Sequence, residues 1–224
     1  MASQITDNFE SYGTGELNGA GSWVVGAGNG LWEVESSVVK TGVRAVFNTT
    51  ANSNNGYRTF TGVAAGTQVA YMYHNNASAN KQMQLGIFDT TPADTGTTFG
   101  KNDGAGGCIG CVILKWLAAS SNISARITDQ VTAEPDITTG LAVATWYKAE
   151  IEWSLLQSTF GSIRGRINDG TWSSWFDLPV GNTFVTISAL ALGCGSMTAN
   201  TAAFDELGEP VVAGATSNFL LMGV

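Results

Sequence analysis

Residues 145–154 and 161–168 constrain the fold more than any other part of the sequence. In the first stretch, apolar side chains stand at every second position, and charged or polar side chains stand between them. The second stretch alternates in the same way, with isoleucines on one face and arginines on the other. Because successive side chains of a β-strand point to opposite faces, both stretches are predicted to be strands with one buried face.

The two stretches match each other in a single antiparallel register. Placing Glu152 opposite Arg164 also places Glu150 opposite Arg166, and it pairs apolar side chains on the other face. Opposite charges that face each other across two strands stabilise the pairing, and a slip by one residue would move the charges to the buried face. The sequence therefore predicts an antiparallel hairpin at the centre of a two-layer β protein.

The rest of the chain has the same character. About a dozen short strands are expected, with turn residues every eight to twelve positions or so, and no helical periodicity is evident. Apolar residues make up 44% of the 224 residues, which is enough for a substantial core. We predict an all-β, antiparallel β-sandwich of the jelly-roll type. Expected strands include residues 38–47, 67–73, 82–88, 107–116, 123–128 and 172–176, and residues 132–140 are expected to form a linker.

The charge composition argues against several partners. Only 12% of the residues are charged, the net charge is −8, and lysine and arginine are nowhere clustered. Nucleic acids and anionic membranes carry dense negative charge, so the chain is not expected to bind either. No apolar run reaches transmembrane length, and the first residues lack the features of a secretory signal. We therefore expect synthesis in a host cytoplasm without export by the usual secretion route.

The three cysteines argue against a disulfide framework. Cys108 and Cys111 are three positions apart in a predicted strand, so their side chains are expected on opposite faces. A zinc site built on these two and Cys194 would need a fourth ligand, and His74 is the single histidine of the chain. We predict buried free thiols.

Three segments carry strand signatures that can be compared with known families. They are Asp7-Asn-Phe-Glu-Ser-Tyr12, Trp146-Tyr-Lys-Ala-Glu-Ile-Glu-Trp153 and Ala203-Phe-Asp-Glu-Leu207. Together they resemble the concanavalin A-like lectin and glucanase superfamily, the LamG-like jelly roll, over residues 6–209. The resemblance implies the fold and a function among lectins, glycanases, adhesion modules and phage structural proteins.

The polar face of the predicted hairpin is a candidate carbohydrate site. Aromatic faces stack on sugar rings, and fixed polar groups orient the hydroxyls. The resemblance implies that this face is the concave one that lectins of this fold use. Tryptophans are also common in sandwich cores, and most of the seven are expected to be structural. The candidate residues are Trp146, Glu150, Glu152, Arg164, Arg166 and Trp172.

Catalysis by the same face is the weaker hypothesis. Retaining glycanases of this superfamily carry a Glu-x-Asp-x-x-Glu strand, and the nearest match here is Glu150-Ile-Glu152, followed by Leu155. The Asp and the last Glu of that pattern are therefore missing. Each glutamate also faces an arginine in the predicted register, which is typical of two ordinary ionised carboxylates. We predict a protein without catalytic activity.

The resemblance also implies a structural calcium ion held between the two ends of the domain. Asp7 and Asp205 match the positions of its acidic ligands, and carbonyl oxygens would complete the site. The alternative for each residue is an aspartate that caps a turn. No other cofactor is expected.

The last residues form a separate unit in this interpretation. A jelly-roll domain is expected over residues 1–210, followed by a C-terminal docking tail over residues 211–224. The tail is too apolar to remain in water, so it is expected to pack on its own domain or on a neighbouring chain. Its assembly residues are Phe219, Leu220, Leu221 and Met222.

These observations lead to three functional hypotheses. The first is a non-catalytic structural or decoration protein on the exterior of a phage or similar virion, docked through its termini to other virion proteins. Release by lysis would reconcile an extracellular type of fold with the missing export signal, and a homo-oligomer is expected. The second is a carbohydrate-binding module or lectin that binds surface glycans. The third is a glycoside hydrolase of the laminarinase type.

Overall fold

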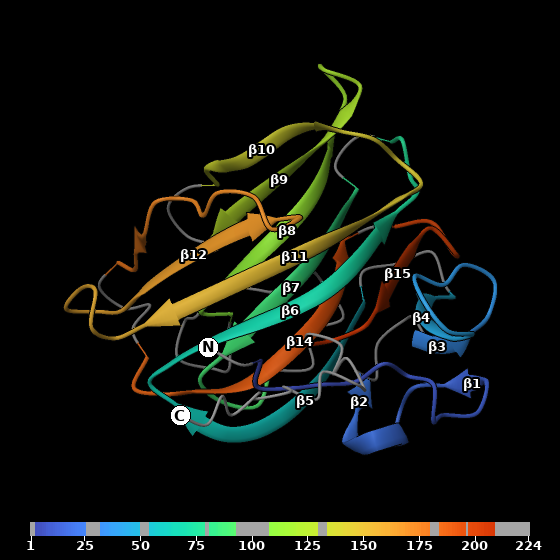
Figure 1. Ribbon diagram of the computed structural model, residues 1–224, viewed down its shortest axis with the longest axis horizontal. Coiled ribbons are helices and arrows are strands. Elements are labelled where there is room, and N and C mark those ends of the chain that lie inside the picture. The colour runs from blue at the N-terminus through green and yellow to red at the C-terminus, as the bar shows by residue number, and fades with distance from the viewer. Residues whose placement is uncertain are drawn as a thin grey trace, which may run out of the picture.

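The computed structural model of the protein is a sandwich of two antiparallel β-sheets (Figure 1). The all-β prediction is confirmed, since a single 3₁₀ turn, η1 (Ala20–Ser22), is the one helical element in the described part of the chain. Likewise, no helix there has the length and apolar character needed to cross a bilayer. The structure describes residues 3–25, 32–49, 54–78, 81–92, 108–129, 134–179, 184–195 and 197–208.

One layer is an 8-stranded sheet among the described residues, with the order β1-β3-β4-β15-β6-β11-β12-β13. β6 and β11 form its centre and pair along ten residues. The strands are β1 (Gly15–Glu16), β3 (Trp32–Glu35), β4 (Ala45–Asn48), β6 (Ala65–His74), β11 (Thr145–Ser154), β12 (Ser162–Ile167), β13 (Phe176–Asp177) and β15 (Ala202–Asp205).

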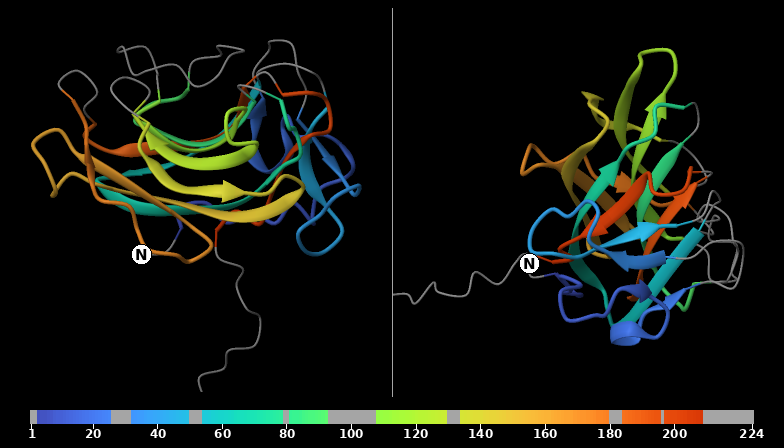
Figure 2. Two further views of the ribbon diagram at one scale, coloured as in Figure 1. Left: turned by 90° about the horizontal axis from the view of Figure 1, so that it is seen from above. Right: turned by 90° about the vertical axis from the view of Figure 1, so that its right-hand side faces the viewer.

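The other layer is a 7-stranded sheet with the order β10-β9-β8-β7-β14-β5-β2, again counted over the described residues. Both sheets bow in the same direction, and the outer face of the 7-stranded sheet is on the concave side (Figure 2). Its strands are β2 (Val24–Val25), β5 (Asn54–Val63), β7 (Gln82–Phe88), β8 (Gly110–Leu117), β9 (Asn122–Thr128), β10 (Asp136–Leu141) and β14 (Ile187–Gly195).

The predicted central hairpin is confirmed residue by residue. β11 and β12 form the hairpin, and the neighbouring β6 carries Gly66 opposite Trp153. A Cβ atom at Gly66 would lie 2.4 Å from the indole ring, so the tryptophan fills the space that only glycine leaves. The observed partners across the hairpin are Glu150 with Arg166, Glu152 with Arg164, and Trp153 with Ile163.

The core lies between the two sheets and is built from the inward-facing positions of both. Trp23, Trp32 and Trp153 are its largest fully buried side chains. The edge of Trp32 packs on Phe204 of β15, with 5.4 Å between ring centroids. Trp116 and Trp146 also pack against buried clusters, so five of the seven tryptophans are structural.

Two predicted strands are shorter than expected. Of residues 38–47, only the end belongs to β4, and residues 40–44 instead donate backbone N–H groups to two carboxylates. The Asp205 carboxylate accepts a hydrogen bond from the Lys40 N–H, and the Glu10 carboxylate accepts one from the Arg44 N–H. These backbone groups therefore have hydrogen-bond partners without a neighbouring strand. Of residues 172–176, only Phe176 is in a strand, because the tryptophans before it fold over the neighbouring β12.

The predicted linker at residues 132–140 is wrong in its second half. Asp136–Leu141 forms β10, an edge strand that pairs with β9. Its side chains are partly or fully exposed, so it shows no apolar alternation that would mark a strand in the sequence. Ion pairs from Arg126 to Glu134 and Asp136 tie it to β9.

All three cysteines are buried and unbridged. The prediction that Cys108 and Cys111 point to opposite faces is wrong, because Cys108 precedes β8 and a bend at Ile109 intervenes. Both thiols belong to one small apolar cluster on the outer face of the 7-stranded sheet, together with Phe88 and Ile113. The Cys108 thiol donates to the carbonyl of Gly110 at 3.2 Å.

The two ends of the described chain meet on the 8-stranded sheet. Asp7 and Leu207 form an antiparallel bridge, with N–O distances of 2.9 and 2.7 Å. The predicted tail at residues 211–224 lies outside the described residues, and so do its assembly residues Phe219, Leu220, Leu221 and Met222. The boundary at residue 210 and the docking role of the tail therefore stay predictions.

Candidate functional site on the outer face of the central hairpin

A groove of about 300 Å³ lies on the outer face of the 8-stranded sheet, over β6, β11 and β12. This volume is at the lower end of the range typical of small-molecule sites. The groove is on the convex side of the sandwich, so the expectation that this polar face is the concave one is wrong (Figure 2). The residues that line it are Ser3, Thr67, Val69, Glu150, Glu152, Arg164, Arg166 and Trp172.

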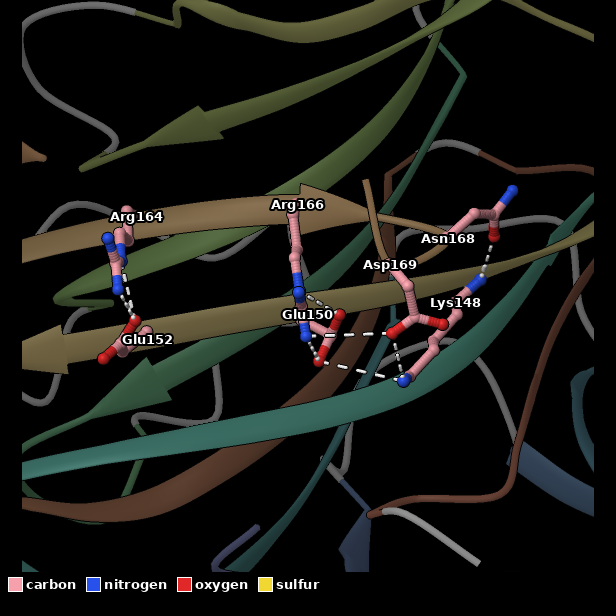
Figure 3. A network of polar contacts seen from close by, with 7 residues as sticks. All are labelled: Lys148, Glu150, Glu152, Arg164, Arg166, Asn168 and Asp169. Atoms are coloured by element: carbon pink, nitrogen blue, oxygen red, sulfur yellow. Dashed lines mark hydrogen bonds and ion pairs between the residues drawn. The ribbon is translucent and has the colours of Figure 1, made fainter. Parts of the chain in front are cut away.

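Two arginine–glutamate pairs form the floor of the groove (Figure 3). Arg166 donates to the Glu150 carboxylate through Nε at 2.5 Å and through Nη2 at 3.0 Å. Arg164 reaches Glu152 Oε2 with Nε and Nη2, each at 2.6 Å. The Glu150 side chain is only 2% exposed, and a charge buried to that degree is stable only with such a partner.

Lys148 and Asp169 extend the network along the sheet (Figure 3). Lys148 Nζ lies 2.7 Å from Asp169 Oδ1 and 3.9 Å from Glu150 Oε1. The hydrogen bond from Lys148 lowers the pKa of the Asp169 carboxyl. The turn after β12 supplies Asp169 and Asn168, which both adopt the left-handed backbone conformation that Asn and Asp tolerate best among residues with a side chain.

Two tryptophans from the segment after β12 cover the arginines. The guanidinium of Arg164 lies 4.8 Å from the ring centroid of Trp172 and 4.5 Å from that of Trp175. Arg166 lies 4.6 Å from the Trp172 centroid. Such cation–π contacts, together with the ion pairs, orient the planar guanidinium groups in the groove.

The structure brings together five of the six predicted carbohydrate residues and leaves out Trp146. That side chain stacks on Tyr73, with 5.3 Å between ring centroids, in a separate apolar cluster that includes Phe47. The wall formed by Thr67 and Ser3 was not among the predicted site residues. Ser3 joins β6 through a parallel bridge to Thr67, a contact between distant segments that no local pattern could have revealed.

The contacts of Asp7 do not fit a calcium site. Asp7 Oδ2 accepts hydrogen bonds from the Tyr12 hydroxyl at 2.5 Å and from Trp23 Nε1 at 2.9 Å. Arg58 Nη1 lies 3.2 Å from the same oxygen. Three donors, one of them cationic, occupy the position where a calcium ion would require further oxygen ligands. Burial and the bond to Asp7 raise the pKa of Tyr12 to about 12.

Asp205 is also committed to hydrogen bonds. Its Oδ2 accepts from the backbone N–H groups of Lys40 at 2.9 Å and Thr41 at 3.3 Å, and its Oδ1 accepts from Glu206 at 2.8 Å. Burial raises the pKa of Asp205 to about 6. The described residues contain no group of three or more acidic, histidine or cysteine side chains placed to share a metal ion. Both aspartates thus have the contacts of structural, turn-capping residues.

His74 lies at the end of β6, away from the groove, and is fully buried. Its Nδ1 accepts from the Asn76 backbone N–H at 3.3 Å, and its Nε2 lies 3.2 Å from the Lys81 carbonyl oxygen. Burial lowers the pKa of His74 to about 4. The neutral ring is therefore a structural residue at the end of a strand.

The comparisons with known proteins establish the fold. No protein-family model and no curated protein matches the sequence. A sialidase superposes with a TM-score of 0.58 at 9% identity, over 92% of this chain, which spans only 18% of the sialidase. The alginate lyase Aly36B superposes with a TM-score of 0.57 at 11% identity, over 93% of this chain and 97% of its own.

A carbohydrate esterase from the Shiga toxin-encoding bacteriophage phi24B gives a TM-score of 0.53 at 15% identity. The match covers 88% of this chain and 98% of the esterase. At these identities the likeness shows a shared fold, a sandwich of two antiparallel sheets, and nothing finer.

The same comparisons contradict the prediction that the chain has no catalytic activity. That prediction relied on an incomplete glycanase motif. Several of the similar structures are nevertheless those of enzymes by name, and alginate lyases recur among them. One missing motif therefore does not exclude catalysis on this fold, which hosts enzymes of several reaction classes.

Proposed function

We propose that the protein recognises a carbohydrate and that the groove over β6, β11 and β12 is the binding site. The observation that carries the proposal is the array of paired charges, covered by tryptophan, on the floor of a groove of sugar-binding size. The similarity to carbohydrate-active proteins supports a carbohydrate as the ligand class.

The geometry offers both kinds of hydrogen-bonding group that a sugar needs. Each carboxylate has about four lone-pair positions, and its arginine takes only some of them. The guanidinium groups donate in fixed directions, because Trp172 holds both of them in place. A sugar hydroxyl donates and accepts at once, so it can bridge a carboxylate and a neighbouring guanidinium.

Glycan binding of the wild type and of Glu152→Gln tests this site. Glu152 is 14% exposed and faces the groove, so the amide should keep the fold while removing one charged acceptor. We expect binding to weaken roughly tenfold, the value of a hydrogen bond to a charged group. The control is Arg126→Gln, which breaks a more exposed ion pair on the other sheet, far from the groove. Equal binding by the wild type and Glu152→Gln would contradict the assignment of the groove.

Carbohydrate processing is the second candidate, and the enzymes among the similar structures favour it. Glu150 and Glu152 lie on one face of β11, two residues apart, which corresponds to about 6.6 Å along the strand. Incubation with polysaccharides, followed by detection of new reducing ends or unsaturated products, tests this candidate. Activity that survives Glu150→Gln and Glu152→Gln would place the chemistry outside the groove.

A location on a virion exterior remains part of the proposal, as does docking through residues 211–224. One of the similar structures comes from a bacteriophage, which supports this setting without specifying a role. Sedimentation with purified particles tests the location, and a variant that ends at Pro210 tests the tail. Light scattering of the same two proteins measures the oligomeric state. Unchanged sedimentation without the tail would refute the docking role.

A further inference from the structure

We infer that the groove selects uncharged saccharides and discriminates against those that carry carboxylates, such as uronates and sialic acids. The inference rests on the proposed function and specifies the class of sugar. It separates this chain from those of its structural neighbours that act, by their names, on acidic sugars, namely the alginate lyases and the sialidase. Three features of the groove and its surroundings support it.

The charges of the groove and its network cancel. Three cationic side chains stand against three carboxylates, so the sum is zero at neutral pH. A site that captures an acidic sugar needs a cation in excess, because the ligand brings a negative charge that must be compensated. The cations are Lys148, Arg164 and Arg166, and the anions are Glu150, Glu152 and Asp169.

Every one of these cations is already engaged at short distance. Arg164 and Arg166 approach their glutamates at 2.6 and 2.5 Å, and Lys148 approaches Asp169 at 2.7 Å. A uronate that took over Arg166 would leave the buried Glu150 carboxylate without its partner and would place a second carboxylate beside it. Both changes oppose binding, since an uncompensated buried charge and a like-charge contact are each unfavourable.

The wall of the groove supplies hydroxyl groups in place of free charges. Ser3 and Thr67 line it, and neither side chain carries a charge, so the wall offers no cation to the carboxylate of an acidic sugar. The net charge of −8 acts in the same direction at longer range, because it repels polyanions such as alginate.

The test is a binding competition at physiological ionic strength. Neutral oligosaccharides of glucose, xylose, mannose and galactose are compared with alginate oligosaccharides and sialyllactose, by calorimetry or ligand-observed NMR. We expect at least one neutral series to bind roughly tenfold more tightly than any acidic sugar, because like charges disfavour the latter. Glu152→Gln makes the sum of charges positive, so it should weaken the neutral ligand and strengthen the acidic ones, while Arg126→Gln should change neither.

The outcomes separate the inference from the proposed function. Tight binding of an acidic sugar by the wild type, lost in Arg164→Gln, would overturn the inference and leave carbohydrate recognition by the groove intact. Failure of every saccharide to bind would overturn the proposed function and the inference with it. Circular dichroism and a melting curve for each variant confirm that the loss is not caused by unfolding. Glu152→Gln is preferred to Glu150→Gln, because the carboxylate of Glu152 is less buried.

Discussion

The outer faces of the two sheets both carry ion pairs and differ in where these pairs lie and how they are covered. On the 8-stranded sheet, tryptophans fold over the ion pairs, and Glu150 is almost fully buried. On the 7-stranded sheet, the centre of the outer face is apolar, with Cys111 and Ile113 fully buried, and the ion pairs lie at the edge around Arg126. There Asp136 remains 45% exposed. The contribution of an ion pair to stability therefore depends on how far its charges are shielded from solvent.

Breaking one ion pair on each face should change the free energy of unfolding most on the 8-stranded sheet. Arg166→Ala leaves the Glu150 carboxylate buried without its closest cation, and we expect a loss of about 3 kcal/mol of unfolding free energy. Arg126→Ala breaks pairs with exposed carboxylates and should cost about 1 kcal/mol or less. Urea unfolding at neutral pH measures both. Equal losses would show that the cover over the hairpin has no energetic consequence.

A second effect of similar size is the pH dependence of stability. It involves two buried groups of the 8-stranded sheet, His74 and Asp205. His74 has a folded pKa of about 4, below its ordinary 6.5, so the unfolded state binds more protons between these values. Stability contributed by the neutral ring is therefore lost as the pH falls through this window, by about 3 kcal/mol. Asp205, on the neighbouring strand, has a folded pKa of about 6, above its ordinary 3.8. As the pH falls through this window, the folded state binds a proton before the unfolded state does, so Asp205 increases the stability that His74 decreases.

The variant Asp205→Asn removes this compensation. Its amide oxygen can still accept from Lys40 and Thr41, so the loop should remain in place. We expect Asp205→Asn to lose about 3 kcal/mol between pH 6.5 and pH 4, and the wild type to lose clearly less. The control, Asp136→Asn on the 7-stranded sheet, should follow the wild type. Parallel pH profiles for Asp205→Asn and the wild type would rule out the compensation.

The smallest expected effect separates two tryptophans of the 8-stranded sheet. Trp172→Ala removes the contacts to Arg164 and Arg166, so it should reduce stability by about 1 kcal/mol and weaken sugar binding. Trp146→Ala leaves a hole beside Tyr73, outside the groove, and should leave sugar binding unchanged. Thermal melting and a glycan titration measure the two effects. Loss of sugar binding in both variants would indicate a site larger than the groove.

The sequence predicted what neighbouring segments determine and missed what distant segments create. The register of β11 and β12 could be derived, because the charged and the apolar faces of one hairpin agree on a single alignment. The wall formed by Ser3 and Thr67 could not, since it depends on a bridge between the N-terminus and β6. The edge strand β10 was missed for a different reason. Its side chains are partly or fully exposed, so its sequence shows no alternation of apolar and polar residues.

The two ends of the described chain lie side by side on β6. Ser3 is bridged to Thr67, and the backbone N–H of Gly208 donates to the Val69 carbonyl at 2.9 Å, so both ends lie within a few residues of each other along β6. The described chain is therefore close to a closed ring. Circular permutation, with a short linker across these ends and a new opening in the exposed β11–β12 turn near Leu156, is compatible with every strand pairing of the sandwich. The order of the strands along the chain is thus less essential to this fold than the contacts between them.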